Sequence, residues 1–156
     1  MGQTNRVPFV RNTVVATVIL ASLYGLSYGV QSGPLQIPGY ILLMGFGTFG
    51  GAVGPESLFP VLFGIYLISL GAVGAAAVHV VRRRLPENHF AGWRLGVAGA
   101  FGITGVLSIL FAIVALSGTQ MDAVFTTVLS ALVFLGLAGW FAGLFTIRTK
   151  WAENIN

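Results

Sequence analysis

The strongest constraint on the fold is a set of four long apolar stretches that contain no Asp, Glu, Lys or Arg. They cover residues 13–30, 57–81, 95–117 and 123–147. A helix needs about 20 mostly apolar residues to cross the hydrocarbon core of a bilayer. The shortest stretch has 18 residues, and as a helix it would reach about 27 Å. The sequence therefore predicts four transmembrane helices.

The composition excludes the common classes of soluble protein. Of the 156 residues, 56% are hydrophobic and 8% are charged, whereas a soluble domain carries about 25% charged residues. A soluble enzyme, a disordered chain and a nucleic-acid-binding domain are excluded, and the lipid bilayer is the expected surrounding. The predicted fold class is an all-α integral membrane protein, a four-transmembrane-helix bundle that forms one domain over residues 1–156.

The basic residues predict the orientation of the bundle. If the N-terminus is cytoplasmic and the chain crosses four times, all the basic residues lie on the cytoplasmic side, as the positive-inside rule requires. These topology determinants are Arg6, Arg11, Arg82, Arg83, Arg84, Arg94, Arg148 and Lys150. The loop 82–94 is then cytoplasmic, and Glu56 and Asp122 lie outside. We expect a multi-pass protein of the cell membrane with both termini in the cytoplasm.

A glycine-rich external insertion, residues 31–56, separates the first two predicted spans. Its centre, Gly39–Gly54, has 16 residues, six of them glycine. Segments of this length are more often re-entrant or interfacial than spanning, and each interior glycine costs a helix about 1 kcal/mol relative to alanine. We expect the segment either to re-enter the membrane or to cover the bundle as a loop or short helix. A fifth span is the alternative, and it would place two basic residues outside.

The same insertion holds the candidate functional segment. Non-helical backbone at membrane depth is tolerated only where protein buries it or water lines it. A re-entrant segment could therefore line a pore entrance, with the Thr48 hydroxyl and glycine carbonyls as its polar groups. The residues of this candidate functional segment are Gly45, Gly47, Thr48, Gly50, Gly51 and Glu56.

Small residues recur at four-residue spacing in the predicted spans and their flanks. Between helices in lipid, close backbone approach at small residues supplies much of the contact. The positions assigned to helix packing are Gly92, Gly96, Gly139 and Gly143. They predict a compact bundle or contacts between copies in a homo-oligomer.

The predicted spans contain little that could perform chemistry. Ionisable residues inside a membrane usually mark transport paths and proton relays, and His79 is the only such group in the four stretches. The serines in the spans have no nearby histidine, so we expect their hydroxyls to bond to carbonyls of their own helix or a neighbour. We expect no catalytic residues and no enzyme activity.

Cofactor and metal sites are also not expected. Two haem-ligating histidines would need to face each other at one depth, but His89 falls in the loop rather than in a second span. His79, His89 and Glu87 lack the spacing of a metal site. The chain has no cysteine, which excludes thiolate ligands.

These observations favour a non-catalytic accessory or structural subunit of a membrane assembly, packed against another membrane protein or itself. The alternative is a small channel or facilitator that uses Gly39–Gly54. A haem-linked electron carrier is a third hypothesis, and a colourless pure protein would exclude it. The first hypothesis predicts a membrane-protein partner, and the second predicts solute flux in liposomes.

Overall fold

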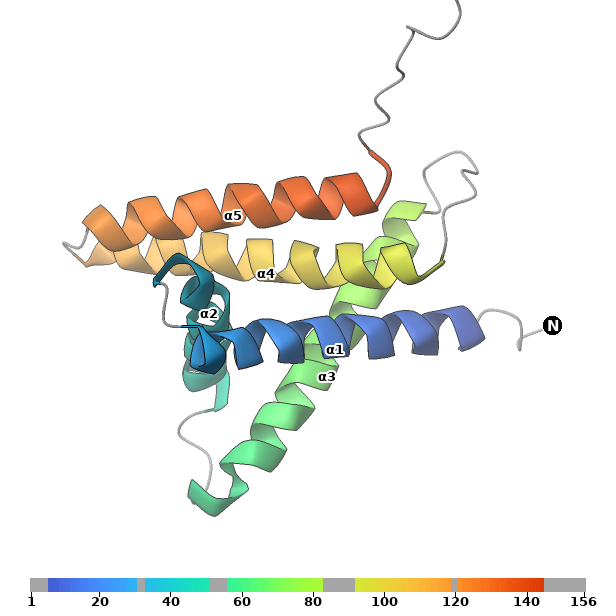
Figure 1. Ribbon diagram of the computed structural model, residues 1–156, viewed down its shortest axis with the longest axis horizontal. Coiled ribbons are helices and arrows are strands. Elements are labelled where there is room, and N and C mark those ends of the chain that lie inside the picture. Colours follow the sequence, from blue (N-terminus) through green and yellow to red (C-terminus); the bar gives the residue numbers. More distant parts are fainter. Residues whose placement is uncertain (1–5, 31–32, 51–55, 83–91, 119–120, 145–156) are drawn as a thin grey trace, which may run out of the picture.

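The computed structural model describes residues 6–30, 33–50, 56–82, 92–118 and 121–144, which are helical almost throughout and contain no strand (Figure 1). The elements are α1 (Arg6–Gly29), α2 (Gly33–Gly50), the short 3-10 helix η1 (Glu56–Leu58), α3 (Phe59–Arg82), α4 (Gly92–Ser117) and α5 (Met121–Phe141). Within this part of the chain, four helices are long and apolar enough to cross a membrane, namely α1, α3, α4 and α5. The prediction of an all-α membrane bundle with four spans is confirmed.

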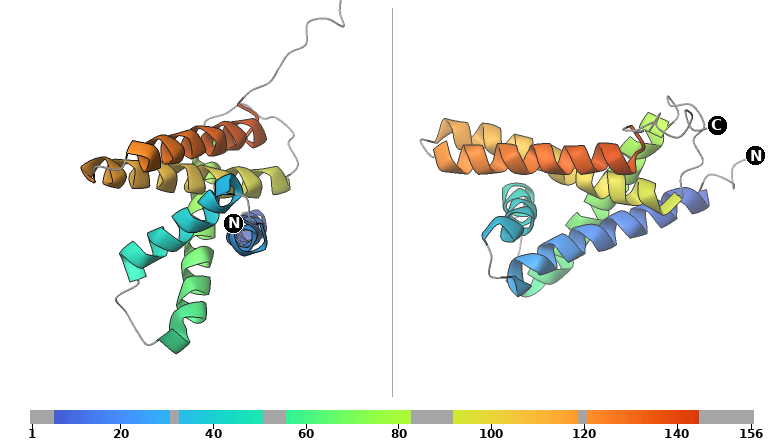
Figure 2. Two further views of the ribbon diagram at one scale, coloured as in Figure 1. Left: turned by 60° about the vertical axis from the view of Figure 1, so that its left-hand side comes forward. Right: turned by 45° about the horizontal axis from the view of Figure 1, so that its top comes forward.

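The helices alternate in direction along the bundle. Figure 1 shows α1, α4 and α5 running along the long axis, while α3 crosses them obliquely. The first residues of α1 and α4 and the last residues of α3 and α5 lie at one end, called here the N-terminal end. The opposite end, where α1 meets α2, is called the α2 end. In the left view of Figure 2, α1 is seen end-on and α2 from the side, so α2 lies across α1.

The core forms where α2 meets the spanning helices. Its buried members come from all of α1, α2, α3 and α4, and they are Ala16, Leu20, Leu42, Phe46, Phe63, Leu67 and Ala100. Leu42 of α2 is completely buried, as is Leu20 of α1, although α2 is not apolar enough to count among the spans. The transverse helix therefore supplies side chains to the middle of the molecule.

Glycines set the closest helix crossings. At the crossing of α3 and α4, a Cβ on Gly74 would lie 2.8 Å from the Gly99 carbonyl oxygen, and a Cβ on Gly99 would lie 2.9 Å from that of Gly74. At the crossing of α1 and α4, a Cβ on Gly96 would lie 2.9 Å from the Asn12 carbonyl oxygen. These backbones approach as closely as small residues in membrane helices permit.

The beginning of α1 and the end of α5 differ most from the apolar stretches that predicted them. Helix α1 begins at Arg6, seven residues before the apolar stretch, because a helix can continue through polar residues outside the hydrocarbon. Helix α5 ends at Phe141, not at residue 147. Gly143 has a φ of 76°, its N–H donates to the Trp140 carbonyl, and the Leu144 N–H donates to the Gly139 carbonyl. This hydrogen-bond pattern is a Schellman motif, which terminates the helix.

Candidate functional site

The glycine-rich insertion forms the helix α2, which corrects the hypothesis of non-helical backbone in the candidate functional segment. The helix extends from Gly33 to Gly50, so most of its carbonyls accept helical hydrogen bonds and do not line a passage. Gly51 lies outside the described residues. Glu56 begins η1, before α3.

Two contacts attach the beginning of α2 to the end of α1. The Gln36 side-chain amide donates a 2.8 Å hydrogen bond to the Val30 carbonyl, which closes the last turn of the preceding helix. Gly39 lies against the Ser27 side chain, and a Cβ at this glycine would be 3.2 Å from the Leu23 carbonyl oxygen. The Gln36 hydrogen bond and the close contact at Gly39 therefore hold α2 at a steep angle to α1.

The two faces of α2 differ. Its inner face buries Leu42 and Phe46 in the core. Its outer face exposes Met44, Gly47 and Thr48. The Thr48 hydroxyl donates to the Met44 carbonyl at 2.9 Å, so it is satisfied within its own helix. Of the segment's residues with described surroundings, Gly47 and Thr48 therefore lie on the outer face, whereas Gly45 lies against Tyr66.

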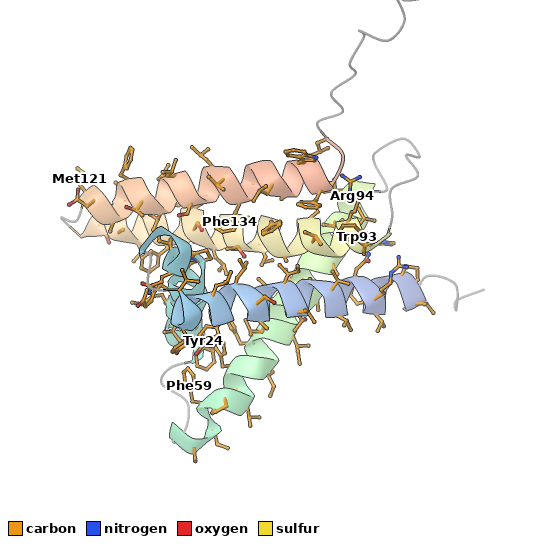
Figure 3. All side chains as sticks on the ribbon, in the orientation of Figure 1. Tyr24, Phe59, Trp93, Arg94, Met121 and Phe134 are labelled. Atoms are coloured by element: carbon orange, nitrogen blue, oxygen red, sulfur yellow. The ribbon has the colours of Figure 1, made fainter. Side chains whose placement is uncertain are left out.

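An aromatic cluster fills the space between α1, α2 and α3 at the α2 end. It consists of Tyr24, Phe46, Phe59, Phe63 and Tyr66, with Tyr24 and Phe59 labelled in Figure 3. Phe46 of α2 contacts three of the rings at centroid distances of 5.3 to 5.5 Å. These distances are typical of aromatic packing. The cluster occupies the volume that a conduit beside α2 would need.

Gly45 brings α2 close to a tyrosine hydroxyl of this cluster. A Cβ at Gly45 would lie 2.5 Å from the hydroxyl oxygen of Tyr66. That oxygen is buried and has no hydrogen-bond partner among the described residues. The sequence suggested Gly45 as part of a pore entrance. In the structure, Gly45 leaves room for the Tyr66 side chain.

Most serine and threonine hydroxyls in the described spans bond to their own helices, whereas the buried Thr13 hydroxyl has no described partner. Four serines donate to the carbonyl four residues earlier, as the sequence predicted, and they are Ser22, Ser69, Ser108 and Ser130. The buried Thr104 and Thr127 do the same. In the described spans, these hydroxyl groups therefore form local hydrogen bonds and do not line a polar path through the bundle.

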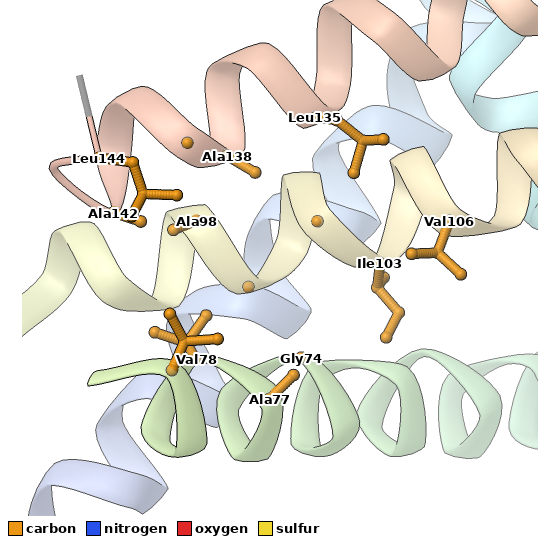
Figure 4. A pocket seen from close by; sticks show the side chains of 14 residues that line it. Gly74, Ala77, Val78, Ala98, Ile103, Val106, Leu135, Ala138, Ala142 and Leu144 are labelled. Carbon is orange, nitrogen blue, oxygen red and sulfur yellow. The ribbon is translucent and has the colours of Figure 1, made fainter. Parts of the chain in front are cut away.

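A second feature is an open apolar cavity of about 310 Å³ between α3, α4 and α5, called here the groove. Figure 4 shows α4 as its floor, with α3 and α5 as its walls. Every lining residue is Gly, Ala, Val, Ile or Leu, including Gly74, Val78, Gly102, Leu135 and Ala138. Sequence analysis missed the groove. Recurring small residues of α4 and α5 line the groove. Their spacing in the sequence does not show which helices are separated by a gap.

The glycines assigned to packing have different surroundings. Gly96 lies at the crossing of α1 and α4, and Gly92 lies against the guanidinium of Arg11. Gly139 is buried and lines the groove. Gly143 lies beyond α5, in the cap that ends it.

The described basic residues gather at the N-terminal end. Arg6 begins α1, Arg82 ends α3 and Arg94 lies in the first turn of α4. The Arg94 guanidinium lies 6.0 Å from the centroid of the Phe141 ring. Arg11 follows Arg6 by about one turn, whereas Arg83, Arg84, Arg148 and Lys150 lie outside the described residues.

The acidic residues of the described helices lie at the other end. Glu56 begins η1, and Asp122 lies in the first turn of α5, where a carboxylate favours the helix dipole. Among the residues that the structure describes, no three His, Asp or Glu side chains are grouped to hold a metal ion. Among the residues that the structure describes, the basic ones therefore lie at one end of the bundle and the acidic ones at the other.

The site thus has two parts, the filled α2 end and the open groove. Compared with known proteins, the chain matches no protein-family model, no curated sequence and no solved structure. Its function has to be inferred from the arrangement of its own residues.

Proposed function

We propose that the protein is a non-catalytic accessory or structural component of a membrane assembly. The observation that carries this proposal is the filled α2 end. Phe46 of α2 and the rings of the aromatic cluster occupy the space beside the candidate functional segment, where a conduit formed by that segment would lie. A protein with this interior acts through its surface.

The polar atoms inside the bundle support the same function. A channel needs a continuous series of polar groups along its path. The buried polar atoms without a partner among the described residues are Asn12 Oδ1, Thr13 Oγ1 and the Tyr66 hydroxyl oxygen. The first two atoms lie in the first half of α1 and the third lies in the aromatic cluster. These three atoms therefore do not form a continuous polar path.

The outer face of α5 is the surface we assign to a membrane-protein partner. Helix α5 packs along α4 and, among the other described elements, contacts only α2. The opposite face is exposed along its whole length and consists of Phe125, Leu129, Leu132, Val133, Gly136 and Trp140. A transmembrane helix of a partner can lie along this face.

Gly136 supports this assignment. Apart from its own stretch of helix, no described atom lies within 4 Å of the position that its Cβ would take, which is also true of Gly25 in α1. The packing of the monomer therefore does not require glycine there, although glycine costs a helix about 1 kcal/mol relative to alanine. A small residue on an exposed membrane face permits the close approach of a second helix.

We place the N-terminal end of the bundle on the cytoplasmic side of the cell membrane. Arg6, Arg11, Arg82 and Arg94 lie at this end, and basic residues are retained in the cytoplasm. Both termini are then cytoplasmic, and α2 lies in the outer half of the membrane.

Photo-crosslinking in the native membrane tests the proposal. A photoreactive amino acid at Leu132, on the outer face of α5, should give one discrete adduct with a different polypeptide. The same amino acid at the exposed Ile68 of α3 is the matched control and should give none. Gly136→Leu should abolish the Leu132 adduct, because its side chain keeps a partner helix at a distance.

Three results would contradict the proposal. They are the absence of an adduct at Leu132, equal adducts at Leu132 and Ile68, and an adduct with the mass of two copies of this chain. Solute flux through liposomes containing the purified protein would favour the channel hypothesis instead.

A further inference from the structure

We draw no further inference here: the strongest candidate, the open apolar groove between α3, α4 and α5, is lined only by glycines and aliphatic side chains, and nothing in the structure shows what covers it.

Discussion

Gly74 and Gly99 decide how closely α3 and α4 approach each other. The Cβ atom of an alanine at either position would press on the backbone of the other helix at less than 3.0 Å. Backbone atoms cannot rotate away as a flexible side chain can. The close crossing of α3 and α4 therefore requires that neither Gly74 nor Gly99 carry a Cβ atom.

We expect Gly99→Ala to lower the free energy of unfolding in detergent by about 1–3 kcal/mol, the usual effect of overpacking. The matched control is Gly136→Ala, whose new Cβ has no neighbour within 4 Å. The control should leave stability unchanged or raise it by up to about 1 kcal/mol through helix propensity. Equal stability of the two variants would show that α3 and α4 are further apart.

The contact between Gly45 and Tyr66 permits a double-mutant cycle. Gly45→Ala should be destabilising because the new Cβ meets the Tyr66 hydroxyl oxygen. Tyr66→Phe removes that oxygen and loses no hydrogen bond to a described residue. In the Tyr66→Phe background, Gly45→Ala should therefore cost at least about 0.5 kcal/mol less, the scale of coupling between residues in contact. Additive effects would mean that α2 does not rest on Tyr66.

Some roles of single residues could be predicted from the sequence and others could not. The serine hydroxyls bond to their own helices because a local carbonyl is always in reach, as at Ser108. The surroundings of Gly45 and Gly143 could not be predicted, because a glycine looks the same in sequence whether it faces a ring, a ligand or a helix end. Only the neighbours in space distinguish these uses.

At the scale of elements, α2 is the helix that the sequence predicts least well. Its glycines and Pro38 are unfavourable inside a helix. The structure compensates for them through tertiary contacts, since Leu42 and Phe46 enter the core and Gln36 caps α1. Local helix propensity does not include these tertiary contacts. The sequence therefore predicts a helix here only as one of several alternatives.

Cysteine labelling tests the two faces of α2, and the natural chain has no cysteine to interfere. Met44 is 52% exposed and Leu42 is completely buried. In detergent, Met44→Cys should react with a small maleimide at least roughly tenfold faster than Leu42→Cys, whose reaction requires local opening. Similar rates at the two positions would indicate that α2 is not packed on the bundle.

The spans are predicted much better than their arrangement. Each span is specified by its own run of apolar residues, because the bilayer imposes the same length on every helix. The oblique course of α3 and the groove beside it depend on which small residues meet, such as Gly74 with Gly99. That pairing is a property of the whole molecule and has no signal within one segment.

At the scale of the whole molecule, the α2 end of the bundle is filled, the groove between α3, α4 and α5 is open, and the exposed side chains of the described spans are mostly apolar. The core and the aromatic cluster leave no polar path through the described spans, while α5 exposes a complete face. We propose that such a protein acts by binding another membrane protein.

The most direct test is the native mass of the protein after extraction from its own membrane in mild detergent. We predict a complex that contains a second polypeptide in a fixed ratio, and we expect Gly136→Leu to release this chain as a smaller species. The control Ala76→Leu should keep the wild-type mass. A wild-type particle made only of copies of this chain would contradict the account.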